Sequence, residues 1–260
     1  MNYYLRPEIS SSDICKIFEL TSAEFVHYFE KRQIELSKKS SAMVLGSLFH
    51  SLITNQTSDE FVISPFENFR TKESQQWKES QTKMILTKDS EDFSKANKMI
   101  ESAKSHKTIN KLISGVYDVE KEFYGTMNNL ALRIKIDGLY KNKLGEVYLI
   151  DFKTTSDLKE FQKSFTDYKY YMRLAFYKEV LSQNNIDVKK VYLPVVSSKE
   201  PFDCELFEIP DDVLQLGSYE FKDGLQMIKT AFEEQNKEKS VKQINLTDYV
   251  QRKLIQKYFN

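Results

Sequence analysis

The chain has 260 residues, and 38 Lys and Arg balance 38 Asp and Glu, so its formal net charge at pH 7 is zero. Only 7 glycines and 5 prolines, together with 13% aromatic residues, exclude the collagen-like, linker-like and disordered classes. No apolar run reaches the roughly 18 residues of a membrane span, and the first residues lack the apolar stretch of a signal peptide. We therefore expect a soluble, cytoplasmic protein.

The N-terminal part of the chain is predicted to be mainly helical. Apolar side chains at helical spacing indicate helices at 10–36, 42–53, 88–104 and 106–114. Between them, residues 54–82 look irregular apart from a short strand-like run at 61–64. The helix at 42–53 carries His50, and its small Gly46 suits close packing against another element.

From about residue 117 the apolar side chains alternate, which is typical of strands. This pattern predicts strands at 119–125, 130–140, 146–155, 188–196 and 204–210. A turn at 141–145 would join the second and third of these strands into a hairpin. A long amphipathic helix is expected from Leu158 to about Ser182.

The last part of the chain is again predicted to be helical. Asp211 or Asp212 would cap a helix that reaches about residue 235, and a charged tail to about 243 would end in a further helix.

Together these elements predict a mixed α/β fold, with a central mixed sheet flanked by helices. We expect one domain with a helical part over about 10–114, a sheet core over about 117–210 and C-terminal helices over about 211–260.

The predicted sheet carries two aspartates and a lysine that are candidate catalytic residues. Asp137 follows Ile-Lys-Ile and Asp151 follows Val-Tyr-Leu-Ile, on strands that the hairpin would place side by side. Asp151 and Lys153 are two positions apart on a strand, so their side chains would leave the same face. Two carboxylates suit Mg²⁺ or Mn²⁺, and a nearby lysine can orient water or neutralise charge.

An ordinary structural interpretation stays open at this point. Asp137 could close a turn before Gly138, and Asp151 and Lys153 could form an exposed pair. Against this, a carboxylate at the end of a buried run destabilises the fold unless it is paired or metal-bound. The two cysteines, Cys15 and Cys204, are too few for a zinc knuckle or an iron–sulfur cluster, so oxygen and imidazole ligands would hold any metal.

The string RIKIDGLYKNKLGEVYLIDFKTTSDL at 133–158 resembles the core of the PD-(D/E)XK nuclease superfamily. Further strings narrow the resemblance to the RecE-type (exonuclease VIII-like) exonucleases of phages and prophages. MVLGSLFHSLI at 43–53, LISGVYDVEKEFYG at 112–125 and FQKSFTDYKYYMRLAFYKEVL at 161–181 are similar to motifs of that family, in the same order. The resemblance covers roughly residues 10 to 235.

The resemblance implies roles for five residues. Asp137 and Asp151 would bind the divalent metal, with His50 as a further ligand, and Lys153 would assist the attacking water. Glu120 would be an acidic member of the same cluster. The neighbouring Glu122 is an open alternative to Glu120, because both could share one face of a strand.

Three more residues are candidates for substrate contact. The family's long helix carries a Gln-x-x-x-Tyr pair, whereas this chain has Arg173 and Tyr177 at the matching positions. Arginine can bind a phosphate with two hydrogen bonds, whereas an exposed arginine packed on the tyrosine ring is the structural alternative. Thr154, just after the lysine, is a possible supporting contact.

By resemblance, the protein would be a metal-dependent exonuclease that acts on ends of double-stranded DNA, from 5′ to 3′, in a bacterium or a phage-infected host. It would expose 3′ single strands for a single-strand annealing protein and work as a homo-oligomeric ring. The alternatives are a PD-(D/E)XK endonuclease of repair or restriction type and a catalytically silent DNA-binding module.

Overall fold

A computed structural model describes residues 6–31, 40–56 and 61–235, together with 250, 252–253 and 256–257. Within these residues no helix is both long and apolar enough to cross a bilayer. The final helix expected after residue 243 lies largely outside the described residues.

The single helix expected over 10–36 is two helices, α1 (Ser11–Ile17) and α2 (Ser22–Lys31). The reason is a capping signal inside the apolar pattern. The Thr21 N–H donates to Glu24 Oε2 at 2.9 Å and Thr21 Oγ1 accepts from the Glu24 N–H at 3.4 Å, which starts a new helix. Residues 32–36 lie outside the described residues.

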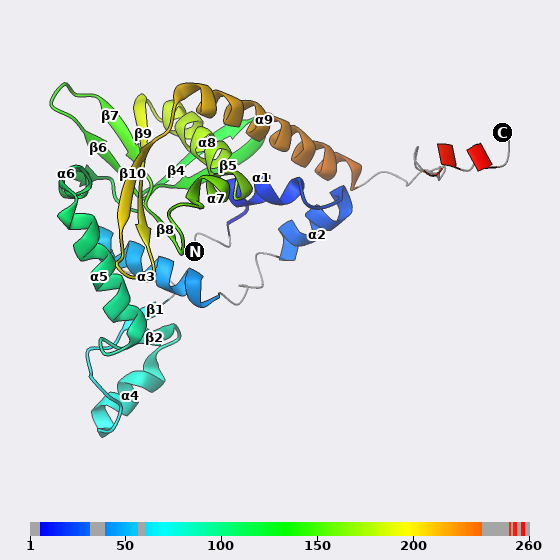
Figure 1. The fold of residues 1–260 in the computed structure, drawn as a ribbon. Helices are drawn as coiled ribbons and strands as arrows, with labels where there is room; N and C mark the ends of the chain where they lie inside the picture. The colour runs from blue at the N-terminus through cyan, green and yellow to red at the C-terminus, as the bar shows by residue number, and fades with distance from the viewer. Residues whose placement is uncertain are drawn as a thin grey trace.

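The other N-terminal helices are confirmed as α3 (Ser41–Thr54), α5 (Glu91–Ser105) and α6 (Lys107–Gly115). The prediction of an irregular region at 54–82 is wrong in part. This region contains α4 (Lys72–Ser80), which begins with a capping box. The strand-like run is β1 (Phe61–Ile63), which pairs in parallel with β2 (Met84–Leu86). Figure 1 shows α4 beyond this pair, at the lower tip of the molecule.

The main sheet has six strands in the order β10-β9-β7-β6-β3, with β8 paired to β9 beyond β7. The strands are β3 (Val116–Tyr117), β6 (Gly138–Lys141), β7 (Val147–Ile150), β8 (Lys153–Thr155), β9 (Val188–Ser197) and β10 (Cys204–Glu208). The expected hairpin is confirmed, because β6 and β7 are antiparallel with Gly138 opposite Ile150. A separate ribbon joins β4 (Glu122–Met127) to β5 (Leu130–Lys135).

Two predicted strands are interrupted in the structure, and each interruption holds an aspartate. The strand expected at 130–140 is divided into β5 and β6, so the chain leaves the ribbon and enters the main sheet at Ile136 and Asp137. The strand expected at 146–155 is divided into β7 and β8 by Asp151 and Phe152. Both β7 and β8 pair in parallel with β9, and between them the Asp151 N–H donates to Tyr192 O at 3.1 Å.

The long helix expected at 158–182 is also divided, into α7 (Phe161–Asp167) and α8 (Tyr170–Gln183). Lys169 between them has φ of 53°, a left-handed conformation that a continuous helix does not allow. The following helix is α9 (Asp211–Glu234). Pro210 is its N-cap, so Asp211 and Asp212 lie in the first turn and neither is the cap that the sequence suggested.

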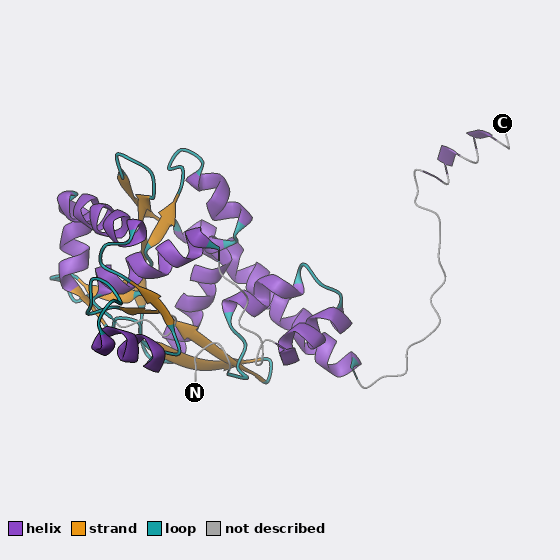
Figure 2. Cartoon of the chain, turned by 90° about the horizontal axis from the view of Figure 1, so that it is seen from below, coloured by secondary structure: helices purple, strands orange, loops and turns teal. Residues whose placement is uncertain are grey.

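Helices cover both faces of the sheet, as the fold class predicted (Figures 1 and 2). Along β9, Val191, Leu193 and Val195 belong to a core shared with α1, α2, α8 and α9. Tyr192 and Val196 face a second core, shared with α3, α5 and α6. This alternation places the sheet between two helical layers.

The contact between α8 and α9 gives a test of the packing. A Cβ atom added at Gly217 would lie 2.5 Å from the backbone oxygen of Tyr171. We expect Gly217→Ala to lower the free energy of unfolding by about 1–3 kcal/mol, because the two helices would have to separate. Chemical denaturation measures this change. Leu216→Ala is the matched control, because Leu216 is 65% exposed on the same helix and its loss should cost less than about 0.5 kcal/mol. Equal stability of the Gly217 variant and the parent would contradict the packing.

Candidate active site

Asp137 lies at the centre of the site, in the link between β5 and β6. Its Oδ2 accepts the backbone N–H of Phe152 at 2.7 Å, from the link between β7 and β8. The same oxygen lies 3.3 Å from His50 Nδ1. One carboxylate therefore ties a helix to both interruptions of the sheet.

The helix α3 brings His50 to this point. A Cβ atom at Gly46, one turn before His50, would lie 3.3 Å from Thr154 Oγ1 on β8. The small residue therefore allows α3 to approach the strand closely, as the sequence suggested. Thr154 is half-buried beneath this helix.

Glu120 joins the same cluster, from the turn between β3 and β4. One ligand atom each of His50, Glu120 and Asp137 lies within 4.8 Å of the others. The Glu120 N–H donates to Asp137 O at 3.4 Å, and its carboxylate lies 2.7 Å from Lys135 Nζ. The expectation that Glu120 stands on a strand is wrong, because its φ is 53° and β4 begins only at Glu122.

Glu122 points to a different set of partners. Its carboxylate lies 3.4 Å from Arg6 and accepts a short hydrogen bond from Tyr124. The two glutamates do not share a strand face as expected, because the left-handed turn separates them. Geometry therefore favours Glu120 over Glu122 as the acid of this cluster.

Asp151 and Lys153 form a close ion pair, as their spacing predicted. The Lys153 ammonium also donates to Phe152 O at 3.3 Å and lies 5.2 Å from the centre of the Tyr170 ring. Asp151 is buried and lies outside the group of His50, Glu120 and Asp137. The carboxylates thus have separate partners, with Asp137 facing His50 and Asp151 facing Lys153.

The pKa values follow from burial and from these partners. Burial alone would lower the pKa of His50 and of Lys153, but the neighbouring carboxylates, Asp137 and Asp151, outweigh it and raise both. Burial would raise the pKa of Asp137, but His50 and Lys153 hold it below its usual range. Burial raises the pKa of Asp151; Lys153 opposes this and the Asp137 carboxylate adds to it.

The donor atoms of this cluster fit a divalent cation. Two carboxylates and one imidazole nitrogen converge within a few ångström, and bonds of about 2.0–2.1 Å to a central ion would draw them together. Carboxylate ligands suit Mg²⁺ and Mn²⁺, which complete their coordination with water and substrate phosphate.

Helix α8 presents the substrate candidates beside this cluster. Arg173 and Tyr177 are half-buried. The Arg173 side chain hydrogen-bonds to Cys15, while its Nε is buried without a hydrogen-bond partner among the described residues. Burial raises the pKa of Tyr177 and the Asp151 carboxylate adds to it, so the phenol lies within electrostatic reach of the site. The exposed arginine of the alternative interpretation is not observed.

Two residues of the site were missed from the sequence, Tyr170 and Lys135. Tyr170 lies three residues before Arg173 and seven before Tyr177, so helical spacing already placed it on their face. Lys135 gave no such signal, because its partner Glu120 lies in a turn whose conformation the pattern does not encode.

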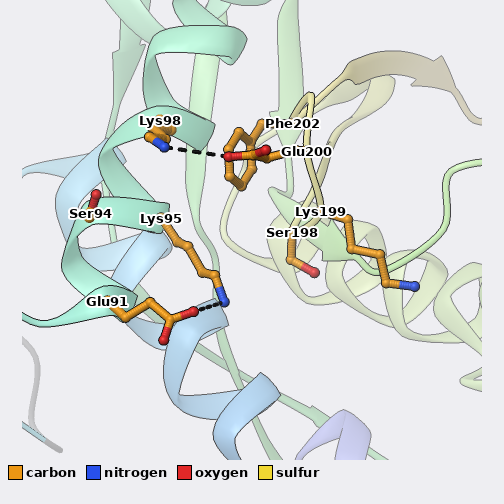
Figure 3. Close-up of a pocket in the computed structure, with 8 residues that line it drawn as sticks. All are labelled: Glu91, Ser94, Lys95, Lys98, Ser198, Lys199, Glu200 and Phe202. Atoms are coloured by element: carbon orange, nitrogen blue, oxygen red, sulfur yellow. Dashed lines mark ion pairs between the residues drawn. The ribbon is translucent and has the colours of Figure 1, made fainter.

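A hollow of about 390 Å³ lies elsewhere, between α5 and the loop that follows β9. Figure 3 shows its ion pairs, with Lys95 at 2.6 Å from Glu91 and Lys98 at 3.5 Å from Glu200. None of the residues expected at the active site lines this hollow. Charged pairs therefore line this hollow.

A helix-flanked mixed sheet that gathers carboxylates, a lysine and a histidine at its interrupted strands defines a PDDEXK-like domain. The chain belongs to the family described as "PDDEXK-like domain of unknown function (DUF3799)", whose model matches residues 10–249.

One solved structure has a similar fold over nearly its whole length. A crystal structure named "Putative exonuclease" from Eubacterium rectale is 16% identical, with a TM-score of 0.57, and the match covers 94% of this chain and 92% of that chain. A second crystal structure, of SSO0001, is 14% identical with a TM-score of 0.33, over 71% of this chain and 84% of that chain. A comparison with curated proteins gave no match.

The choice between the two glutamates can be measured directly. We expect Glu120→Gln to weaken Mn²⁺ binding by about tenfold or more, because it removes one charged member of the cluster. Glu122→Gln is the matched control, since it alters the contact with Arg6 and Tyr124 and should leave the affinity unchanged. Isothermal titration calorimetry on the full chain gives both values. A larger loss in the Glu122 variant would reverse the assignment.

Proposed function

We propose that the protein is a divalent-metal-dependent deoxyribonuclease, an exonuclease of RecE type that hydrolyses phosphodiester bonds of linear duplex DNA. One observation carries this proposal: His50, Glu120 and Asp137 converge at one strand interruption, and the Asp151–Lys153 ion pair lies at the other, within electrostatic reach of Asp137. Carboxylates that can hold a cation beside a fixed ammonium group are the chemistry that phosphodiester hydrolysis by water requires.

The residues divide the work of the reaction. A divalent ion, Mg²⁺ or Mn²⁺, held by Asp137, Asp151 and His50 with Glu120 would supply Lewis-acid charge at the phosphodiester. For this, one oxygen of the Asp151 carboxylate would face the ion instead of Lys153. The raised pKa of Lys153 keeps its ammonium protonated at neutral pH, so Lys153 would stabilise negative charge and orient water rather than accept a proton.

Arg173 is the proposed contact to a phosphate of the substrate. Its Nε is buried without a partner in the described part of the chain, and a phosphate oxygen would satisfy that N–H. Arginine can bind two phosphate oxygens at once, which the family's glutamine cannot do. Tyr177 and Thr154 would supply further contacts along the same substrate strand.

The finer proposal concerns DNA ends. The likeness over nearly the full length of a protein named "Putative exonuclease" supports an exonuclease rather than an endonuclease. By the RecE-type resemblance, degradation would run from 5′ to 3′ and leave 3′ single strands for an annealing protein. The chain would form one domain and assemble into a homo-oligomeric ring around the duplex.

Linear and closed-circular duplex DNA separate the possible functions. With Mg²⁺ or Mn²⁺ we expect the parent to degrade linear DNA only, and EDTA to abolish this activity. Lys153→Met should lower the rate by roughly 10²-fold or more, because it removes fixed positive charge at the reacting phosphate. Lys190→Met is the control, since Lys190 pairs with Glu208 across β9 and β10.

Each other outcome has a definite meaning. If closed circles are cut, the protein is an endonuclease and the exonuclease assignment is wrong. Intact linear and circular DNA under all conditions would indicate a silent DNA-binding module. A parental rate in Lys153→Met, or in Asp151→Ala, would remove the proposed site.

A second experiment tests the substrate contact. Arg173→Gln restores the side chain typical of the family and should raise KM for duplex DNA about tenfold, because one charged hydrogen bond to phosphate is lost. The rate at saturating DNA should change less than KM. Steady-state kinetics measures both, with Lys178→Gln as the control, because Lys178 lies on the same helix and pairs with Asp211. An unchanged KM would exclude Arg173 from substrate binding.

A further inference from the structure

The Lys135–Glu120 ion pair is a contact of the site that the proposed chemistry does not use. Lys135 is the last residue of β5, and its Nζ lies 2.7 Å from Glu120 Oε2. Both side chains are largely buried, with 28% of Lys135 and 24% of Glu120 exposed. A half-buried pair of this geometry restricts the carboxylate to few orientations.

Glu120 needs such restraint because of where it lies. It belongs to a turn in which both Asp118 and Glu120 have positive φ, at 52° and 53°. The backbone of the turn is held by two hydrogen bonds, from the Glu120 N–H to Asp137 O at 3.4 Å and from the Ile136 N–H to Lys121 O at 3.1 Å. Neither bond fixes the long Glu120 side chain, whereas the Lys135 ammonium contacts its carboxylate directly.

The ribbon register alone does not account for the pairing. In the β4–β5 ribbon, Glu122 lies directly opposite Lys135, and its carboxylate contacts Arg6 and Tyr124. The Lys135 ammonium contacts the glutamate of the cluster. Lys135 directly precedes Ile136 and Asp137 in the link from β5 to β6. The same stretch of chain therefore carries Asp137 and, through the Lys135 side chain, contacts Glu120.

We propose that Lys135 is a positioning residue of the metal centre, which holds the Glu120 carboxylate where it converges with His50 and Asp137 on a divalent cation. This inference rests on the proposed function. Lys135 also brings a positive charge near the cation, but solvent screens that repulsion because both side chains are partly exposed. Loss of a group that orients a ligand typically weakens metal binding 10-fold to 100-fold.

Mn²⁺ titration of the full chain, followed by calorimetry and by the electron paramagnetic resonance signal of free Mn²⁺, tests the inference. We expect Lys135→Met to weaken binding about tenfold or more, and Lys135→Arg to restore it to within about threefold of the parent. Lys190→Met is matched to it, because Lys190 is a strand lysine whose Nζ lies 2.8 Å from Glu208, a carboxylate outside the cluster, and it should leave the affinity unchanged.

The outcomes separate this inference from the function on which it rests. If the parent fails to bind Mn²⁺, the metal centre itself is overturned. If the parent binds and Lys135→Met binds equally well or more tightly, only the role of Lys135 is overturned. Lys135→Gln, which keeps a hydrogen-bond donor without charge, is the second variant where thermal unfolding shows that the methionine variant does not fold. If Lys135→Gln binds Mn²⁺ as tightly as the parent, Lys135→Ala, which has no donor, decides the outcome. Weak binding by Lys135→Ala supports the positioning role, and tight binding overturns it.

Discussion

The carboxylate of Asp137 is the contact on which the rest of the site depends. It accepts the Phe152 N–H at 2.7 Å and lies 3.3 Å from His50, while the backbone oxygen of the same residue accepts from Glu120 at 3.4 Å. These contacts join α3, the β7–β8 link and the β3–β4 turn around one residue. A buried carboxylate is unfavourable without such partners, so its burial requires α3 and the β7–β8 link to be in place.

The interruptions of the strands follow from the same constraint. A carboxylate inside a continuous, doubly covered sheet would face one of the two hydrophobic cores, whereas a residue between two short strands can turn toward the sheet edge. The strand β9 runs past both β7 and β8 and keeps their pairing. The break at Asp151 therefore costs little sheet pairing and frees both Asp151 and Phe152 for the site.

Sequence patterns predicted the elements whose periodicity is local. The β6–β7 hairpin, the pairing of Asp151 with Lys153 and the approach of α3 at Gly46 follow from strand and helix spacing. The division of four predicted elements did not, because capping at Thr21, the left-handed Lys169 and the two aspartate links lie inside apolar patterns that continue across them. The position of Glu120 depends on a left-handed turn and on long-range contacts, which periodicity does not contain.

The charges of the site explain why it would favour phosphate only when a cation is bound. Glu120 and Asp151 are each neutralised by a lysine, Lys135 and Lys153, and Asp137 faces a His50 whose pKa is raised. Without an ion the cluster therefore carries no net positive charge in either protonation state of His50, and it offers little attraction to a phosphodiester. A divalent cation bound there would make the net charge of the site positive. Binding of the DNA backbone and hydrolysis of the phosphodiester would then both depend on binding of the cation.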